Sequence, residues 1–187
     1  MTPYSKKLAS IAINEFLKFR YMREQEPALA KQIENYWQGI AAFPGVDEAW
    51  SAVFVSWCVK QAGATATDFH FSARHSTFVY WAIQNQLHNT GLFKGHDVKT
   101  YAPKVGDILQ NNRSGNHFDY AYAKANQKYI SHSAIVVEVG SDSKGNYLRT
   151  IGGNENDSVG LKEVRLDTKG YVKNASAIYI CVIENLK

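Results

Sequence analysis

The chain has 187 residues, of which 45% are hydrophobic and 20% charged, and its formal net charge is +4. These values are typical of one ordinary globular domain, so we expect residues 1–187 to form a single domain. The sequence has no basic arm for nucleic acid and no apolar run long enough to cross a bilayer, so we expect neither nucleic-acid binding nor membrane insertion.

Residues 1–48 are predicted to form a helical extension that precedes the main body of the domain. An amphipathic helix over residues 5–24 is indicated by apolar residues on one stripe, and Glu15 lies beside that stripe. Glu15 is either a solvated flank or a buried acceptor for a backbone donor, and we expect the solvated flank. A second helix runs from Pro27 to the turn at residues 43–45.

The stretch at residues 49–64 is predicted to be the most buried helix of the chain, ending at Gly63. Asp47 and Glu48 precede it, where acidic side chains complement the positive end of the helix dipole. Ser51 falls in the first turn, beside amide groups without intrahelical partners. Two interpretations of Ser51 stay open: a helix cap, or a hydroxyl at the helix end that can stabilise negative charge.

The next segments change from helix to connector to strand. A further helix is predicted to begin near Ser72, with His75 in its opening turns, and residues 88–104 are predicted to be a long connector. Strands are then predicted around 108–109, 132–139, 147–151, 159–166 and 177–183, with a polar excursion over 111–131 and a turn at 142–146.

Helices followed by strands predict an α+β fold, with the helices packed on one face of an antiparallel sheet. Cys58 lies in an apolar helical pattern and Cys181 in an apolar strand pattern. We therefore expect both cysteines to be small core residues rather than a disulfide.

A nucleophile at a helix start needs a base and a polar group that orients the base. His132 is the predicted base, because it opens a strand whose other residues are apolar and would hold the ring firmly. Asn154 follows the next strand and two glycines. Antiparallel pairing across the turn at 142–146 would bring it near His132, where it could fix the imidazole tautomer.

This order of motifs resembles the papain-like cell-wall peptidases and amidases of the NlpC and CHAP types. Residues 50–55 resemble their Trp-Cys-Ala-x-Phe-Val helix start, and residues 103–108 resemble their Pro-Gly-Asp-Leu-Val turn. Residues 132–137 are similar to their His-Val-Gly-Ile-Val strand, and residues 151–154 to their Gly-Asn step. The resemblance implies a papain-like fold, with residues 49–187 as the catalytic-type core.

The chain also resembles, over almost its whole length, the bacterial domain of unknown function 2272. That resemblance includes the N-terminal Ala-x-x-Glu helix, Tyr36 and Trp37, the Trp-Ser-Ala helix, the Ser72-x-x-His75 pattern and the Ile-Gly-Gly-Asn step.

The chain departs from the peptidase pattern at the nucleophile, where Ser51 stands in place of cysteine. A serine must lose its proton during attack, so it depends more on its base and on oxyanion donors than a thiolate does. Three accounts stay open: Ser51 is a working nucleophile, the domain has lost catalysis and kept binding, or an inactivating change from cysteine to serine has been engineered.

Further residues are candidates for substrate binding, namely Trp50, His75, Arg113 and Tyr120. His75 is suggested by its resemblance to the close family, and Arg113 and Tyr120 lie in the excursion expected to overhang the cleft. His117, Asp119 and His132 match no common zinc spacing, so we expect no metal and no cofactor.

The sequence analysis thus predicts a peptidoglycan hydrolase, a peptidase or amidase, in which Ser51 attacks, His132 transfers the proton and Asn154 orients His132. The alternative is an inactive papain-like module that binds cell-wall peptides or a partner protein. No signal peptide is recognisable, so we expect cytoplasmic synthesis and delivery to the periplasm or cell wall, as an antibacterial effector or phage lysis enzyme. An effector of this kind would have an immunity or delivery protein as partner.

Overall fold

The computed structural model describes residues 1–42, 49–174 and 176–187. The helices are α1 (Pro3–Phe19), α2 (Pro27–Gly39), α3 (Ser51–Ala62), α4 (His75–His88) and α5 (Tyr120–Ala125). The strands are β1 (Phe93–Asp97), β2 (Ile108–Asn112), β3 (Ser131–Asp142), β4 (Gly145–Gly152), β5 (Gly160–Arg165) and β6 (Tyr179–Asn185). The turn expected at 43–45 and the residues Asp47 and Glu48 lie outside the described residues.

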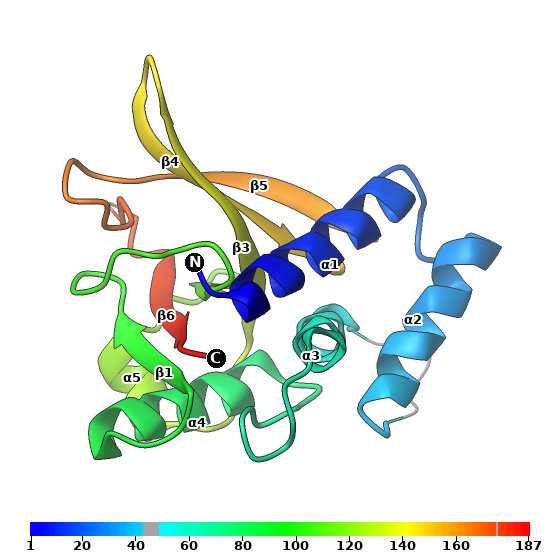
Figure 1. Ribbon diagram of the computed structural model, residues 1–187, viewed down its shortest axis with the longest axis horizontal. Coiled ribbons are helices and arrows are strands. Elements are labelled where there is room, and N and C mark those ends of the chain that lie inside the picture. Colours follow the sequence, from blue (N-terminus) through cyan, green and yellow to red (C-terminus); the bar gives the residue numbers. More distant parts are fainter. Residues whose placement is uncertain (43–48, 175) are drawn as a thin grey trace.

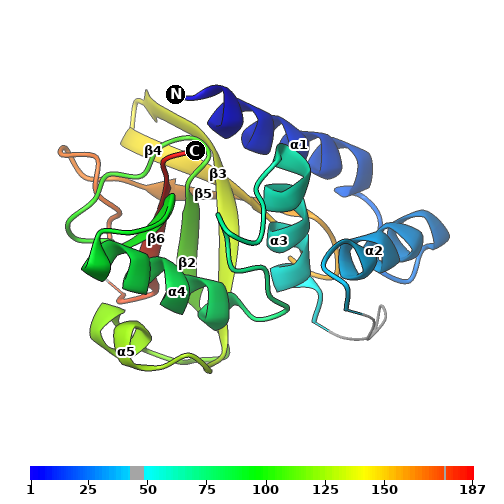
Figure 2. The ribbon, with the colours of Figure 1, turned by 60° about the horizontal axis from the view of Figure 1, so that its bottom comes forward.

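The described strands form one antiparallel sheet with the order β1-β6-β2-β3-β4-β5. Helices α1, α3 and α4 lie against one face of this sheet, α2 packs on the outer side of α3, and the tip of the β3–β4 hairpin projects away from the helices (Figure 1). In Figure 2, α4 and α5 lie at one end of the molecule and α2 at the other. The α+β prediction, with N-terminal helices and a C-terminal antiparallel sheet, is confirmed.

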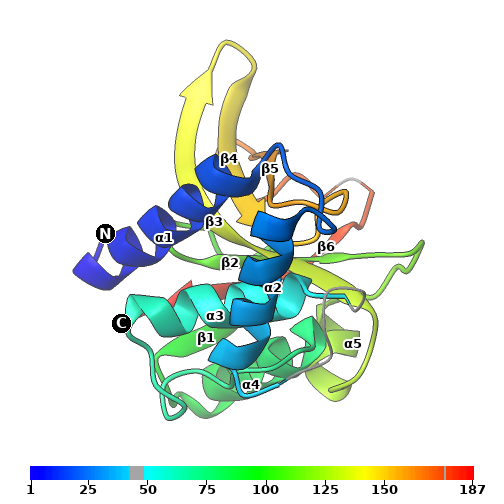
Figure 3. The same cartoon turned by 90° about the vertical axis from the view of Figure 1, so that its right-hand side faces the viewer.

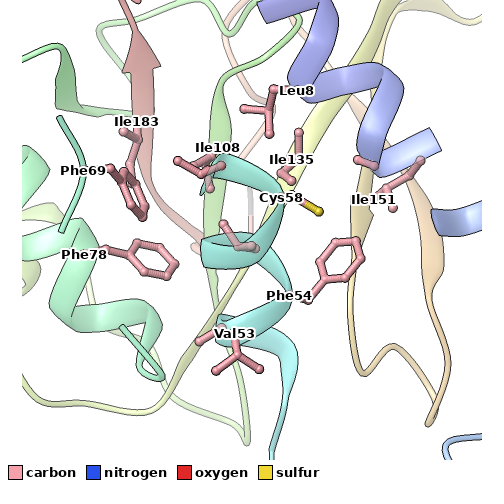
Figure 4. Close-up of a cluster of buried hydrophobic side chains, with 14 of the residues drawn as sticks. Leu8, Val53, Phe54, Cys58, Phe69, Phe78, Ile108, Ile135, Ile151 and Ile183 are labelled. Carbon is pink, nitrogen blue, oxygen red and sulfur yellow. The ribbon is translucent and has the colours of Figure 1, made fainter. Parts of the chain in front are cut away.

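Helix α3 runs through the centre of the main core, because nearly its whole circumference is apolar. Its side chains pack against α1, α2, β3 and β4, and α2 crosses it on the outer side (Figure 3). Gly63 ends the helix in the left-handed conformation at φ 112°, as its position predicts. Figure 4 shows Phe54 and Cys58 of this helix among apolar side chains from α1 and the sheet.

The two cysteines are buried and unpaired, which confirms their expected place in the core. Burial also raises the pKa of the Cys58 thiol well above its usual range, so this thiol stays protonated and unreactive. None of the helices in the described part of the chain is both long and apolar enough to span a membrane.

Helices α1 and α2 are built into the core and are not a loose extension. Leu8, Ala12 and Phe19 of α1 are buried against α3 and the sheet. The expected solvated position of Glu15 is wrong: its carboxylate accepts hydrogen bonds from Tyr36 Oη at 2.5 Å and Gln32 Nε2 at 3.0 Å. Glu15 is half-buried, which raises its pKa, and it joins α1 to α2 by accepting from side chains, not from a backbone donor.

The structure contains two elements where no regular structure was expected. Strand β1 lies inside the expected connector at 88–104, and helix α5 lies inside the polar excursion. β1 is an edge strand of low β-propensity, Phe-Lys-Gly-His-Asp, which is held by pairing with β6. Tertiary pairing that local sequence does not encode explains why this prediction was wrong.

Candidate active site

Ser51 is the first residue of α3, and a buried tryptophan anchors this end of the helix. Trp50 is completely buried, stacks on Tyr36 and donates its indole N–H to Glu24 at 2.8 Å. Its N-cap residue, Trp50, makes no capping hydrogen bond with its side chain, so among the described residues the first amide groups of the helix are left for another acceptor. The prediction that Trp50 contacts substrate is wrong, because its side chain is completely buried. Its contacts with Tyr36 and Glu24 instead hold the residue that precedes Ser51.

His75 is the first residue of α4, and it lies beside Ser51. The loop before α4 is tied to α3 because Ser56 Oγ donates to the Ser72 carbonyl at 2.9 Å and accepts from the Ser72 N–H at 3.1 Å. This connection brings the starts of the two helices together. Ser51 Oγ lies 2.7 Å from Nε2 of His75, and the two residues are 2% and 6% exposed.

The environment of His75 favours a neutral imidazole. Burial lowers its pKa well below 6.5, and the nearby His132 and Arg113 lower it further. A neutral ring with its proton on Nδ1 can accept the Ser51 hydroxyl proton at Nε2. Nδ1 of His75 is buried and has no hydrogen-bond partner among the described residues. The pair therefore has the form of a serine and its base, with the far side of the base unpaired.

His132 lies behind His75, on the sheet. It is the second residue of β3, opposite Asn111 of β2, and its ring centroid is 5.1 Å from that of His75 with an interplanar angle of 58°. Ser51, His75 and His132 thus occupy one small region of the molecule. The structure places His75, and not the expected His132, at hydrogen-bonding distance from the serine.

Glu155 is the residue that contacts His132. Its Oε1 lies 2.7 Å from Nε2 of His132, close enough for an ion pair, although the oxygen is off the direction of a hydrogen bond. Lys162 pairs with the other carboxylate oxygen. Although burial opposes ionisation, the contacts with His132 and Lys162 lower the pKa of Glu155 to about 2, so the group is a carboxylate.

The start of β3 and the bend after β4 lie side by side, as expected, but the residue that contacts His132 is not Asn154. Asn154 makes no hydrogen bond to His132 in the described structure, because His132 is faced by Glu155, one residue further along. Asn154 adopts the left-handed conformation at φ 54°, within the bend that turns Glu155 inward. The residue at contact distance from His132 is thus Glu155, which the sequence analysis missed.

The two glycines before Asn154 are required by close approach. A Cβ on Gly152 would lie 2.9 Å from Nε2 of His132, and a Cβ on Gly153 would lie 2.6 Å from atoms of both Phe54 and Trp50. Both distances are too short for ordinary packing. The Gly-Gly step therefore lets the end of β4 contact His132 on one side and α3 on the other.

An open groove with a volume of about 580 Å³ reaches Ser51 and His75. One wall comes from the starts of α3 and α4, and the other from the segments that flank α5. The groove residues are Ala49, Ser51, Ala52, Ala73, Arg74, His75, Arg113, Ser114, Lys128, Tyr129, Ile130 and Ser131. The excursion over 111–131 thus forms one wall and does not fill the groove.

The remaining candidates take different places. Arg113 lies in the groove wall as expected. Tyr120 is not in that wall, because it is on α5 and donates to the Gly95 carbonyl at 2.8 Å.

The described residues hold no group of three or more His, Cys, Asp or Glu side chains placed to bind a metal ion. Asp119, considered above with His117, instead caps α5 by accepting from the Tyr122 N–H at 2.8 Å.

Comparison with known proteins identifies one family. The family described as "Uncharacterized protein conserved in bacteria (DUF2272)" matches residues 24–181 of the chain. This range includes every residue of the site described above. No curated protein and no solved structure matches the chain. Because the match covers most of the chain, this protein belongs to the bacterial family of domain of unknown function 2272.

Proposed function

We propose that this protein is a serine hydrolase that cleaves peptide or amide bonds of peptidoglycan, with Ser51 as nucleophile and His75 as general base. The observation that carries the proposal is the 2.7 Å contact between Ser51 Oγ and His75 Nε2 at the wall of an open groove. A hydroxyl within hydrogen-bonding reach of a neutral imidazole is the arrangement that activates serine. The choice of peptidoglycan rests on the resemblance to papain-like cell-wall enzymes.

In the proposed mechanism, Ser51 Oγ attacks the carbonyl carbon of the scissile bond while its proton passes to Nε2 of His75. The oxyanion that forms receives hydrogen bonds from the uncapped amide groups at the start of α3, including that of Ser51. His75 then gives the proton to the leaving amine, and the acyl-enzyme forms. Water, deprotonated by His75, releases the acid and restores Ser51.

In this proposal the carboxylate of Glu155, acting across His132, offsets the positive charge of the base. His75 becomes an imidazolium when it takes the serine proton, and a positive ring needs a negative partner nearby. The Glu155 carboxylate lies one imidazole away, in contact with His132. We therefore assign His132 and Glu155 as positioning residues, and the Ser51–His132 pair remains the alternative catalytic pairing.

A binding module without turnover is the second candidate. The low exposure of Ser51 and His75, 2% and 6%, favours it, because a substrate carbonyl must reach both atoms. In that case the groove would hold a wall peptide or a partner protein while Ser51 served as a structural hydroxyl.

Release of soluble fragments from purified peptidoglycan separates the two candidates. The wild-type protein is expected to release muropeptides, and Ser51→Ala is expected to lower the rate by at least about 10³-fold. Ser10→Ala is the matched control, because Ser10 is exposed on α1 and far along the chain from the groove residues. No release by wild-type protein, together with retained binding to peptidoglycan, would favour the binding module.

Delivery and partner remain part of the same proposal. A peptidoglycan hydrolase acts in the periplasm or cell wall, so we propose that it works there as an antibacterial effector or a phage lysis enzyme. An effector would be bound in the producing cell by an immunity protein. Expression in the periplasm of a sensitive bacterium is expected to cause lysis with wild-type protein and not with Ser51→Ala.

A further inference from the structure

The groove next to Ser51 has a marked excess of positive charge. Arg74, Arg113 and Lys128 line it, whereas none of its described lining residues is acidic. All three cations are exposed, and none forms an ion pair with a residue that the structure describes. By contrast, both arginines of the β-sheet, Arg149 and Arg165, are paired with carboxylates.

The cations come from separate parts of the chain that the fold brings together. Arg74 directly precedes His75 at the start of α4, Arg113 follows β2, and Lys128 lies between α5 and β3. The segment that carries Arg113 is held in place because Asn112 donates to the Phe118 carbonyl and accepts from the Phe118 N–H, at 2.8 and 3.0 Å. The cationic wall is therefore built on anchored backbone.

The segment that carries Lys128 is anchored in a similar way. Tyr129 N–H donates to Ser76 Oγ at 3.3 Å, and the Tyr129 ring packs edge-on against Phe118. Gln110 of β2 contacts Tyr129 Oη through its amide group. The two ends of the excursion are thus fixed to α4 and to the sheet, so Arg113 and Lys128 are both carried by anchored backbone at the same wall of the groove.

We infer that the substrate of this groove is an anionic acyl compound, a peptide with a free carboxylate close to the scissile bond, and that Arg113 binds this carboxylate with help from Arg74 and Lys128. The part of this inference that concerns a scissile bond rests on the proposed function. The preference of the groove for an anionic ligand is a property of binding alone. A guanidinium without a protein carboxylate is suited to bidentate recognition of a ligand carboxylate.

Binding of such a carboxylate also has a consequence for the base. Burial is the largest cause of the lowered pKa of His75, and His132 and the positive charge of Arg113 add to it. A carboxylate bound to Arg113 would offset that charge and so raise the pKa of His75. The base would then become stronger when the correct substrate is in place.

Binding to the Ser51→Ala protein tests the inference without turnover. The probes are N-acetyl-L-alanyl-D-glutamate and its neutral diamide, with affinities measured by isothermal titration or NMR at low salt. The acid is expected to bind at least about tenfold more tightly than the diamide. Arg113→Gln in the same background is expected to remove most of that preference, and high salt is expected to reduce it.

Arg20→Gln is the matched control, because Arg20 is an exposed arginine that lies outside this groove. It is expected to leave the preference for the acid unchanged. Equal binding of acid and diamide, no binding of either probe at millimolar concentration, or an unchanged preference in Arg113→Gln would overturn the inference.

The failure of the hydrolase proposal would look different. If the acid is preferred through Arg113 but wild-type protein releases no fragment from peptidoglycan, the anionic-ligand site stands and catalysis fails. If fragments are released while Ser51→Ala shows no preference for the acid, the hydrolase stands and this inference fails.

Discussion

The site consists of two pairs of side chains, one without a carboxylate and the other without a hydroxyl. Ser51 and His75 are carried by helix ends and form a hydroxyl–imidazole pair without a carboxylate. His132 and Glu155 are carried by β3 and the bend after β4, and they form an imidazole–carboxylate pair without a hydroxyl. The two rings lie 5.1 Å apart. Together the pairs contain the three kinds of group that a serine hydrolase uses, with one additional imidazole between base and carboxylate.

The difference indicates a division of roles. Of the two pairs, only the helix-borne pair lines the open groove, so it is the pair that we expect to contact a substrate there. In the sheet-borne pair, Glu155 forms an ion pair with Lys162 of β5 and lines a separate hollow beside that strand. Reactivity is therefore expected to depend mainly on Ser51 and His75, and charge stabilisation on His132 and Glu155.

The largest expected effect comes from substituting each of the two histidines in turn. His75→Ala is expected to lower kcat/KM by about 10³-fold or more, because it removes the base. His132→Ala is expected to lower it by about ten- to a hundredfold, since the base remains. The rates are measured on soluble peptidoglycan fragments, with thermal unfolding as a check on folding. The reverse order of the two losses would make His132 the base.

A second substitution acts where the bend after β4 packs against α3. Gly153→Ala places a Cβ 2.6 Å from Phe54 and Trp50, and this overpacking is expected to cost about 2 kcal/mol of stability, roughly a thirtyfold change in the folding equilibrium. Urea unfolding measures the loss. A midpoint equal to that of the wild-type protein would show that the end of β4 is free to move away from α3.

A third substitution, Glu155→Gln, keeps the shape of the carboxylate and removes its charge. Because Glu155 acts through His132, the expected loss in kcat is only about tenfold, with little change in KM. A merely structural role would lower stability and leave kcat of the folded protein unaltered. The comparison of kcat with the unfolding free energy therefore decides between these roles.

The smallest expected effect is on the pH dependence of the reaction. The pKa of His75 lies well below 6.5, so its ring stays neutral and kcat/KM is expected to change by less than about twofold between pH 8 and 6.5. A base with an ordinary histidine pKa would lose half its activity at pH 6.5.

The same shift acts on stability. The unfolded state takes up a proton on His75 near pH 6.5 and the folded state only at lower pH, so this contribution to stability is complete above pH 6.5 and declines as the pH falls below it. Substitution of His75 is expected to remove that decline. Urea unfolding of wild-type protein and His75→Gln at pH 5.5 and 7.5 measures it.

Much of the fold followed from local pattern. The apolar circumference of α3, Gly63 at its end and Pro27 at the start of α2 all encode elements that the structure contains. The turn after Asp142 encodes the β3–β4 hairpin. Strand β1 and Glu15 could not be predicted in this way, because each depends on a partner distant in sequence, β6 in one case and Tyr36 in the other.

In the candidate site, too, local sequence identified some residues, and tertiary contacts determined the others. Ser51 and His132 were found because a helix start and a strand start mark them in the sequence. The pairing of Ser51 with His75 depends on the Ser56–Ser72 contact, which sets two helix ends side by side and leaves no sequence signal. Glu155 could have been considered, since it directly follows the Gly-Gly-Asn step, but which side chain of that bend turns inward is set by tertiary packing.

Covalent labelling tests the central claim most directly. A fluorophosphonate reacts only with a serine whose hydroxyl is activated by a base, and mass spectrometry of the digested protein identifies the modified residue. The wild-type protein is expected to carry one label, at Ser51, and His75→Ala is expected to lose it while His132→Ala keeps it at a reduced rate. An unlabelled Ser51 in the wild-type protein, or full labelling in His75→Ala, would contradict the account.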